Sequence, residues 1–388
     1  MNLRRLSILG CTGSIGTSTA DVVEHLRRVD PDVRWDVRSI SGHANVERLA
    51  ELEQRLAPED VVVSDPASAT RYAGRRSPKV GPEALIDAAT DPAVDTVVAG
   101  IVGRAGLEST LAALRAGKRV ALANKETLVV AGPVLRREIG EAGGCELLPV
   151  DSEHSAIWQS FGTDLPCRRA AERCRRIVLT ASGGPFRDWS AERLRDATPA
   201  DALNHPTWDM GAKITIDSAT MMNKALEIIE ARWLFDVPAD AIEAVIHPQS
   251  IIHSMVELHD GSVVSQMSPP DMRMPIQLAL THPRRVAGIA STLDRGERHE
   301  LTLQPVDRER FPAVELGFEV AAAGGTAGAV VNAANEVAVR RFLDGEIRFI
   351  DIVPTCRRVL EHHTFEADPT LDRLIELDRW SRSEASAL

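Results

Sequence analysis

The chain has 388 residues, which is enough for two or three domains of ordinary size. Acidic residues outnumber basic ones by 56 to 45, and a formal charge of −11 disfavours a nucleic acid or a membrane surface as the partner. Apolar residues make up 44% and charged residues 26%, the balance of a globular protein, and no stretch is long and apolar enough to span a bilayer. The five cysteines lack C-x-x-C spacing and no leader precedes the first strand, so we expect a cytoplasmic protein without disulfides or zinc.

The first 150 residues alternate short β-branched runs with amphipathic helical stretches. This alternation predicts a parallel sheet covered by helices. The strand-like runs are 6–9, 35–40, 61–63, 96–99, 119–123 and 146–150.

After residue 150 the pattern changes to mixed α and β structure. In chain order it predicts a helix over 155–161, strands over 176–180 and 213–217, a helix over 219–235 and a hairpin over 251–267 with Asp-Gly at its turn. Residues 285–310 read as a linker, and 311–388 are helical. We therefore expect a first domain over 1–150, a second over 151–284 and a third over 311–388.

A glycine-rich turn, Gly10 to Gly16, joins the first strand to the first helix. Glycines three residues apart at such a turn favour binding of a dinucleotide pyrophosphate, although a purely structural turn is the alternative. The second strand ends Ser41-Gly42-His43-Ala44-Asn45 without an acidic residue for the ribose hydroxyls. His43 and Asn45 could hydrogen-bond a 2′-phosphate, which favours NADP(H).

Two carboxylates, Asp151 and Glu153, directly follow a predicted strand. At this spacing they can converge on one cation, and oxygen ligands favour Mg²⁺ or Mn²⁺ over zinc, although such pairs are often merely solvated. Farther along, Ser218 is a candidate helix N-cap, and Glu227 could supply a third carboxylate. A surface pair between Lys224 and Glu227 is the alternative there.

Three further segments carry candidate site residues. The turn after strand 176–180 contains Ser182, which could bind a phosphate together with Ser218, Asn223 and Lys224. The loop 205–211 is a candidate lid over the ligand with Trp208 at its centre, unless that tryptophan packs in the core. Asn124-Lys125-Glu126 follow a strand at the sheet edge where α/β folds bind ligands.

These segments occur together and in order, and the chain resembles the 1-deoxy-D-xylulose 5-phosphate reductoisomerase family from residue 6 to at least residue 343. The motifs that carry the resemblance are Gly10–Gly16, 123–126, 148–154, 181–186, 205–211, 217–227, 246–250 and 332–336. The resemblance implies an N-terminal Rossmann-like NADPH-binding domain, a central α+β catalytic domain with metal site and lid, and a C-terminal α-helical domain. It also implies a homodimer. The implied reaction is NADPH- and metal-dependent isomerisation and reduction of 1-deoxy-D-xylulose 5-phosphate to 2-C-methyl-D-erythritol 4-phosphate, a step of non-mevalonate isoprenoid synthesis.

The resemblance also implies a role for each matching residue. The implied ligands of Mg²⁺ or Mn²⁺ are Asp151, Glu153 and Glu227. The implied catalytic residues are Lys125, Glu153, Glu227 and His205. The implied substrate contacts are Lys125, Ser152, Glu153, Ser182, His205, Ser218, Asn223, Lys224 and Glu227. The implied NADPH contacts are Thr12, Gly13, Ser14, Ile15, Gly42, Asn45, Asn124, Glu126 and Gly211, and the implied lid residues are Trp208 and Met210.

The sequence departs from the family pattern at one place, and it is compatible with two other functions. Gly42 and Asn45 are separated by two residues, where the family usually has one, which affects the adenosine-phosphate contacts. An NADP-dependent reductase without isomerisation would share the nucleotide turn but would not need three carboxylates. A non-catalytic NADPH-sensing protein would bind the cofactor without turnover.

Overall fold

The computed structural model describes residues 2–141, 146–208 and 210–388 and divides the chain into two compact units. The first unit contains Met1–Thr127, Glu138–Ser155 and Asp271–Thr292. The second contains Leu128–Arg137, Ala156–Pro270 and Leu293–Leu388. None of the described helices has the length and apolar character that crossing a membrane requires.

A seven-stranded, fully parallel sheet forms the centre of the first unit, in the order β4-β3-β2-β1-β5-β6-β7. Its strands are β1 (Asn2–Leu9), β2 (Val33–Gly42), β3 (Asp60–Val63), β4 (Lys79–Val80), β5 (Thr96–Ala99), β6 (Arg119–Leu122) and β7 (Glu146–Pro149). The central strands are apolar and buried on both faces, as the near-continuous hydrophobic runs predict. The order reverses at β1, which pairs with both β2 and β5, so the carboxyl end of β1 is the switch point where such sheets bind ligands.

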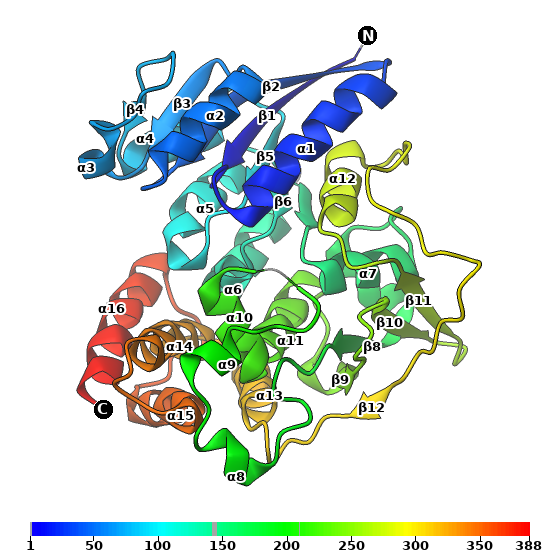
Figure 1. Ribbon diagram of the computed structural model, residues 1–388, viewed down its shortest axis with the longest axis vertical. Coiled ribbons are helices and arrows are strands. Elements are labelled where there is room, and N and C mark those ends of the chain that lie inside the picture. Colours follow the sequence, from blue (N-terminus) through cyan, green and yellow to red (C-terminus); the bar gives the residue numbers. More distant parts are fainter. Residues whose placement is uncertain (1, 142–145, 209) are drawn as a thin grey trace. The chain divides into compact units, whose positions relative to one another are not determined.

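Helices connect the strands of the first unit. They are α1 (Ser14–Val29), α2 (Val46–Leu56), α3 (Pro66–Ala69), α4 (Pro82–Thr90) and α5 (Leu107–Arg115), with α12 (Arg273–Thr281) added from a distant part of the chain. Helix α1 packs against α2 and α12, whereas α4 packs against α5 (Figure 1). Since right-handed crossovers place these two groups on opposite faces, the sheet is covered on both sides.

The second unit contains a five-stranded mixed sheet in the order β11-β10-β8-β9-β12. Its strands are β8 (Cys174–Ala181), β9 (Ile242–Ile246), β10 (Ile252–Leu258), β11 (Val263–Met267) and β12 (Gln304–Pro305). Strands β10 and β11 form the expected antiparallel hairpin, with Gly261 at φ +86° in its turn. Strands β8 and β9 are parallel, and the other pairs are antiparallel.

Helices make up the rest of the second unit. The longer ones are α10 (Ala212–Ala219), α11 (Met222–Leu234), α13 (Ala313–Ala323), α14 (Ala327–Leu343), α15 (Ile352–His362) and α16 (Leu371–Ala387). Short turns of helix are α8 (Ala191–Leu194) and α9 (Pro199–Ala202). Helix α11 packs on α13 and β9, and α14 packs on α15 and α16, which Figure 1 shows in orange and red.

Two helices have residues in both units. Helix α6 (Lys125–Glu141) contributes its first residues to the first unit and Leu128–Arg137 to the second. It contains Pro133, and at Ala131 its backbone leaves helical geometry. Helix α7 (Ser152–Phe161) begins in the first unit and continues in the second.

The mixed α/β class and the helical C-terminal segment are confirmed, but three local predictions are wrong. Residues 213–217 are not a strand: they lie within α10, where Lys213 and Asp217 form an i,i+4 ion pair that only a helix brings together. Ser218 is consequently not an N-cap, because it lies in the last turn of α10. The predicted helix 219–235 begins instead at Met222, after Met221 at φ +62° breaks the chain direction.

Candidate functional site

The glycine-rich turn lies at the switch point of the first sheet, as predicted. Gly10 has φ +78°, and a Cβ there would lie 2.6 Å from the carbonyl oxygen of Gly100, so the turn presses directly on the segment that follows β5. Gly13 is the N-cap of α1 and offers no side chain to the first amides of the helix. Because Gly13 and Ser14 are exposed, these amides are open to an anion.

The end of β2 lies against the glycine-rich turn. Gly42 is buried, and a Cβ there would lie 3.1 Å from Thr12 Cγ2, so these two predicted cofactor contacts are neighbours. Asn45 is exposed and caps α2, accepting a hydrogen bond from the Arg48 amide at 3.2 Å. The segment carries no carboxylate, in agreement with the sequence.

Sequence reasoning missed one cation beside this segment. The Arg71 guanidinium donates to the Ala44 carbonyl at 3.1 Å, and its side chain is 57% exposed. His43 contacts Ser64 Oγ through Nδ1 at 3.0 Å. Since Arg71 lies 26 positions after Asn45, no local pattern links the two.

Asn124 is buried and its hydrogen-bonding groups are used within the protein. Its amide nitrogen donates to the Ile101 carbonyl and, at 2.9 Å, to the Gly103 carbonyl. Its amide oxygen accepts from the Thr127 N–H at 3.2 Å, which caps α6. The side chain therefore holds the loop after β5 in place, in addition to the cofactor contact that the family resemblance implies for it.

The first unit brings Lys125 and Asp151 together as a buried ion pair. Lys125 Nζ lies 2.5 Å from Asp151 Oδ2, and His154, which is fully buried, places Nδ1 3.7 Å from Asp151 Oδ1. Burial alone would raise the pKa of Asp151, but the Lys125 ammonium and His154 outweigh it and hold that pKa well below its ordinary value. His154 is a neighbour of the site that sequence reasoning did not single out.

Asp151 and Glu153 present converging carboxylates at the start of α7. Their nearest oxygens lie within 4.8 Å of each other, and the Glu153 amide donates to Asp151 Oδ1 at 3.3 Å. Ser152 Oγ donates to Glu153 Oε2 at 2.6 Å. This all-oxygen pair suits a hard divalent cation.

The second unit gathers Ser182, His205 and Ser218 around one imidazole nitrogen. His205 Nε2 lies 3.2 Å from Ser182 Oγ and 3.1 Å from Ser218 Oγ. His205 Nδ1 accepts hydrogen bonds from the Thr207 and Trp208 amides, which assigns the proton of the neutral ring to Nε2. Burial lowers the pKa of His205, so near neutral pH this ring is uncharged and donates from Nε2.

Helix α11 carries three of the predicted residues on one side. Lys224 is 2% exposed and Glu227 is 1% exposed, and the two form a buried ion pair rather than the surface pair considered above. Asn223 Nδ2 also donates to Glu227, at 2.5 Å from Oε1. The Glu227 carboxylate is therefore balanced by an ammonium and an amide.

The predicted lid segment connects His205 to α10. Trp208 is half-buried, and its ring centroid lies 6.5 Å from that of His253 in an edge-to-face contact. Gly211 is exposed and is the N-cap of α10. Residue 209 of this loop lies outside the described residues.

Each predicted site residue is placed in one of the two units. The first holds Thr12, Gly13, Ser14, Ile15, Gly42, Asn45, Asn124, Lys125, Glu126, Asp151, Ser152 and Glu153. The second holds Ser182, His205, Trp208, Met210, Gly211, Ser218, Asn223, Lys224 and Glu227.

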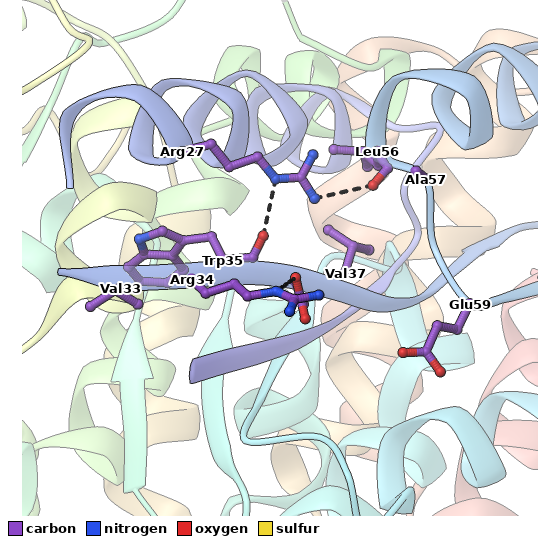
Figure 2. Close-up of a pocket in the computed structure, with 9 residues that line it drawn as sticks. Arg27, Val33, Arg34, Trp35, Val37, Leu56, Ala57 and Glu59 are labelled. Atoms are coloured by element: carbon purple, nitrogen blue, oxygen red, sulfur yellow. Dashed lines mark hydrogen bonds and ion pairs between the residues drawn. The ribbon is translucent and has the colours of Figure 1, made fainter. Parts of the chain in front are cut away.

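A hollow of about 470 Å³ lies elsewhere, at the amino-terminal end of β2. Figure 2 shows Arg27 reaching across it, with hydrogen bonds to the Trp35 and Leu56 carbonyls at 3.0 and 3.1 Å. Its nine lining residues include none of the predicted site residues. Because sheets of this type bind ligands at the carboxyl ends of their strands, this hollow is not the candidate active site.

Comparison with known proteins gives one consistent family. Three family models match: 1-deoxy-D-xylulose 5-phosphate reductoisomerase over residues 6–132, the C-terminal domain of that enzyme over 147–235, and the DXP reductoisomerase C-terminal domain over 267–384. A 1-deoxy-D-xylulose 5-phosphate reductoisomerase of Rhodopirellula baltica is 55% identical, over 99% of this chain and 94% of that relative. One of Thermomicrobium roseum is 47% identical, over 99% of this chain and 97% of the relative.

Two solved structures agree. The Zymomonas mobilis reductoisomerase in complex with NADPH has a TM-score of 0.89 and 43% identity, covering 100% of this chain and 99% of its own. A DOX-P reductoisomerase solved with NADPH, fosmidomycin and magnesium has a TM-score of 0.92 and 38% identity, covering 99% of this chain and 98% of its own.

Proposed function

The chain belongs to the 1-deoxy-D-xylulose 5-phosphate reductoisomerase family, and we propose that the residues described above carry out the reaction of that family. The reaction isomerises 1-deoxy-D-xylulose 5-phosphate and reduces the product with NADPH to 2-C-methyl-D-erythritol 4-phosphate, with a divalent metal. The observation that carries the proposal is 55% identity to an enzyme of this name over 99% of the chain.

Asp151, Glu153 and Glu227 are the proposed metal ligands. The donor set fits Mg²⁺ or Mn²⁺, because all three side chains offer carboxylate oxygens and Asp151 is held ionised by Lys125. A bound divalent cation would polarise the substrate carbonyl and stabilise negative charge that develops on its oxygens. Glu227 now faces Lys224, so a metal at Glu227 would compete with the ammonium for the same carboxylate.

Lys125 and Ser152 are proposed to contact oxygen atoms of the substrate's carbon chain beside the metal. The Lys125 ammonium is already desolvated and fixed by Asp151, so it can act on a substrate oxygen with little reorganisation. The Ser152 hydroxyl donates to Glu153 and can turn toward a substrate oxygen.

The phosphate of the substrate is proposed to bind on the second unit. Ser182, Ser218 and the Nε2 proton of neutral His205 offer hydrogen bonds at one point, and Asn223 and Lys224 add an amide and a charge from α11. A phosphate distant from the reacting carbons lets its binding energy orient the substrate. Trp208 and Met210 are proposed to close over the bound substrate, which would exclude water.

NADPH is proposed to bind at the carboxyl end of the first sheet. Thr12, Gly13, Ser14 and Ile15 supply the pyrophosphate turn, and Gly42 and Asn45 border the adenosine. Arg71 is a further candidate for the 2′-phosphate, because its guanidinium already holds the 43–45 segment. Glu126 and Gly211 are proposed contacts at the nicotinamide end. Asn124, a further proposed cofactor contact, also shapes the loop after β5.

The organisation of the protein completes the proposal. We assign residues 1–150 to cofactor binding, 151–284 to catalysis and 311–388 to a helical domain, with 285–310 as the linker, and we expect a homodimer in the cytoplasm. The four described cysteines are buried and free, which fits a reducing compartment.

The deciding experiment is NADPH oxidation with 1-deoxy-D-xylulose 5-phosphate, with and without Mn²⁺, with the product identified by mass and NMR. Metal-dependent formation of 2-C-methyl-D-erythritol 4-phosphate is the expected result. NADPH oxidation at the same rate with and without Mn²⁺ would favour a reductase that does not isomerise its substrate. Binding of NADPH without any oxidation would favour a sensing protein.

A further inference from the structure

We propose that the C-terminal helices take part in substrate binding through one buried contact, in which Asn335 of α14 holds Asp217 of α10 and thereby positions Ser218. This inference rests on the proposed phosphate site and adds two positioning residues to it. Neither Asn335 nor Asp217 contacts the substrate in the proposal.

Asp217 is a carboxyl group buried in the interior of the second unit. It is 1% exposed, and its two carboxylate oxygens have separate partners. Lys213 Nζ lies 2.8 Å from Oδ2, and Asn335 Nδ2 donates to Oδ1 at 2.8 Å. Because a buried carboxylate is stable only when it is paired and hydrogen-bonded, both contacts restrict where this turn of α10 can lie.

Lys213 and Asn335 restrict the turn in different ways. Lys213 belongs to α10 itself, so its ion pair stiffens the helix without tying it to anything else. Asn335 is fully buried on α14, 118 residues farther along the chain, so its hydrogen bond fixes α10 against the C-terminal helices. Helices α10 and α14 also pack on each other directly.

The fixed turn carries a proposed phosphate contact. Ser218 follows Asp217, and its hydroxyl lies 3.1 Å from His205 Nε2. The Ser218 carbonyl packs against the turn that contains Ser182 and Gly184. A Cβ on Gly184 would lie only 2.5 Å from the Ser218 carbonyl oxygen. A shift of α10 would therefore displace Ser218 and press on the turn that holds Ser182.

The first turn of the same helix supports the end of the lid. Gly211 is the N-cap of α10, and Thr215 Oγ1 donates to the Gly211 carbonyl at 2.9 Å. Helix α10 has only eight residues, too few to hold its position without tertiary contacts. The Asp217–Asn335 contact thus anchors both the phosphate contact and the point where the lid ends.

The test compares two asparagines of the same helix. Asn335→Leu removes the donor to Asp217 while roughly conserving volume. Asn332→Leu is the matched control, because Asn332 is also fully buried on α14 but donates within its own helix, to Glu336 at 3.0 Å. The readouts are KM for the sugar phosphate, KM for NADPH, kcat, the inhibition constant of inorganic phosphate, and the urea midpoint.

We expect Asn335→Leu to raise the substrate KM and the phosphate inhibition constant about ten- to a hundredfold, the range for a lost hydrogen bond to a charged group, with the NADPH KM unchanged. Asn332→Leu should lower the urea midpoint and leave both phosphate readouts within about twofold. Equal effects of the two variants on the substrate KM would overturn the proposal, and so would a normal KM in Asn335→Leu.

An exchange of the two side chains gives a second, independent comparison. Asn335→Asp sets two carboxylates against each other and should weaken phosphate binding. Adding Asp217→Asn restores the hydrogen bond in the reverse direction, from the amide at position 217 to the carboxylate at position 335. The amide oxygen at position 217 then faces Lys213. The double variant should therefore regain a substrate KM within about threefold of the wild type. Absence of rescue would refute the positioning role, and this pair also serves if Asn335→Leu does not fold.

Wild-type turnover, measured first, separates the two levels of inference. A wild-type chain that fails to convert the sugar phosphate contradicts the proposed function. A wild-type chain that converts it, with variants that show none of the expected differences, contradicts only the role of Asn335 and Asp217.

Discussion

Replacing Asn124 by alanine tests whether this residue acts on the cofactor directly or through the protein. The substitution removes the donor to the Ile101 and Gly103 carbonyls and the acceptor that caps α6 at Thr127. The loop that it releases lies against the glycine-rich turn, because the Gly100 carbonyl leaves no room for a Cβ at Gly10. A loosened loop should therefore disturb the cofactor site without any lost contact to the cofactor.

The expected loss of stability follows from the three hydrogen bonds. The Gly103 carbonyl bond is buried, and an unsatisfied buried acceptor costs about 1–3 kcal/mol. The bond to the Ile101 carbonyl is only partly buried and contributes about 1 kcal/mol, and a lost N-cap contributes about 1 kcal/mol. Since neighbouring terms do not add fully, we expect the free energy of unfolding to fall by about 3 kcal/mol.

Urea unfolding and NADPH titration together are the assay. We expect the lower stability to be accompanied by an NADPH dissociation constant raised about tenfold, which corresponds to about 1.4 kcal/mol. Thr370→Ala is the control, because Thr370 caps α16 by accepting from the Arg373 amide at 3.2 Å, is exposed and lies outside the proposed cofactor site. It should cost only about 1 kcal/mol and leave the NADPH dissociation constant unchanged. If Asn124→Ala keeps its stability within about 0.5 kcal/mol and still loses NADPH affinity, the positioning argument is wrong and Asn124 contacts the cofactor.

Three further predictions concern the charges of the second unit. Glu227→Gln keeps the volume but removes a proposed metal charge, so kcat should fall by about a thousandfold and more metal should be needed for half-maximal rate; near-normal turnover would exclude a ligand role. Lys224→Arg retains the charge, but the larger guanidinium does not fit at a position where the lysine is only 2% exposed. The substrate KM should therefore rise about tenfold, and an unchanged KM would count against the phosphate site. Burial lowers the pKa of His253 in the folded protein below the ordinary histidine value of about 6.5. At a pH near or below about 6.5 the unfolded chain therefore binds more protons than the folded one. As a result, this residue lowers the free energy of unfolding as the pH falls from 7 to 5. His253→Gln can keep the donor to the Ser268 carbonyl and should reduce that slope in urea midpoints measured at pH 7, 6 and 5. An identical slope would show that His253 binds the same number of protons in the folded and unfolded states, which would contradict the prediction.

The strands and motifs of the first unit could be predicted from the sequence because each depends on neighbouring residues only. Six apolar runs of the first 150 residues became strands of the parallel sheet, since runs of this kind are buried on both faces between helices. The edge strand β4 was missed, because its two exposed residues bury no apolar pattern that could reveal it. The glycine-rich turn was also predictable, since its spacing follows from the backbone geometry of one strand-to-helix connection.

The segment 213–217 shows where local patterns stop being informative. Its alternating isoleucines suit a strand, but five residues cannot separate a period of 2 from a period of 3.6. The outcome depended on partners far along the chain, because in α10 the polar Asp217 meets Asn335 in the interior. A residue 118 positions away leaves no trace in the local pattern.

The sequence by itself determined the family, the sheet of the first unit and the identity of the candidate site residues. Only the tertiary structure decided what each side chain does: Asn124 is used internally, Lys125 is paired with Asp151, and His205 joins Ser182 to Ser218. The physical reason is that side-chain type limits which hydrogen bonds and charges are possible, whereas the partner that completes them is chosen by contacts between segments that are distant in the chain.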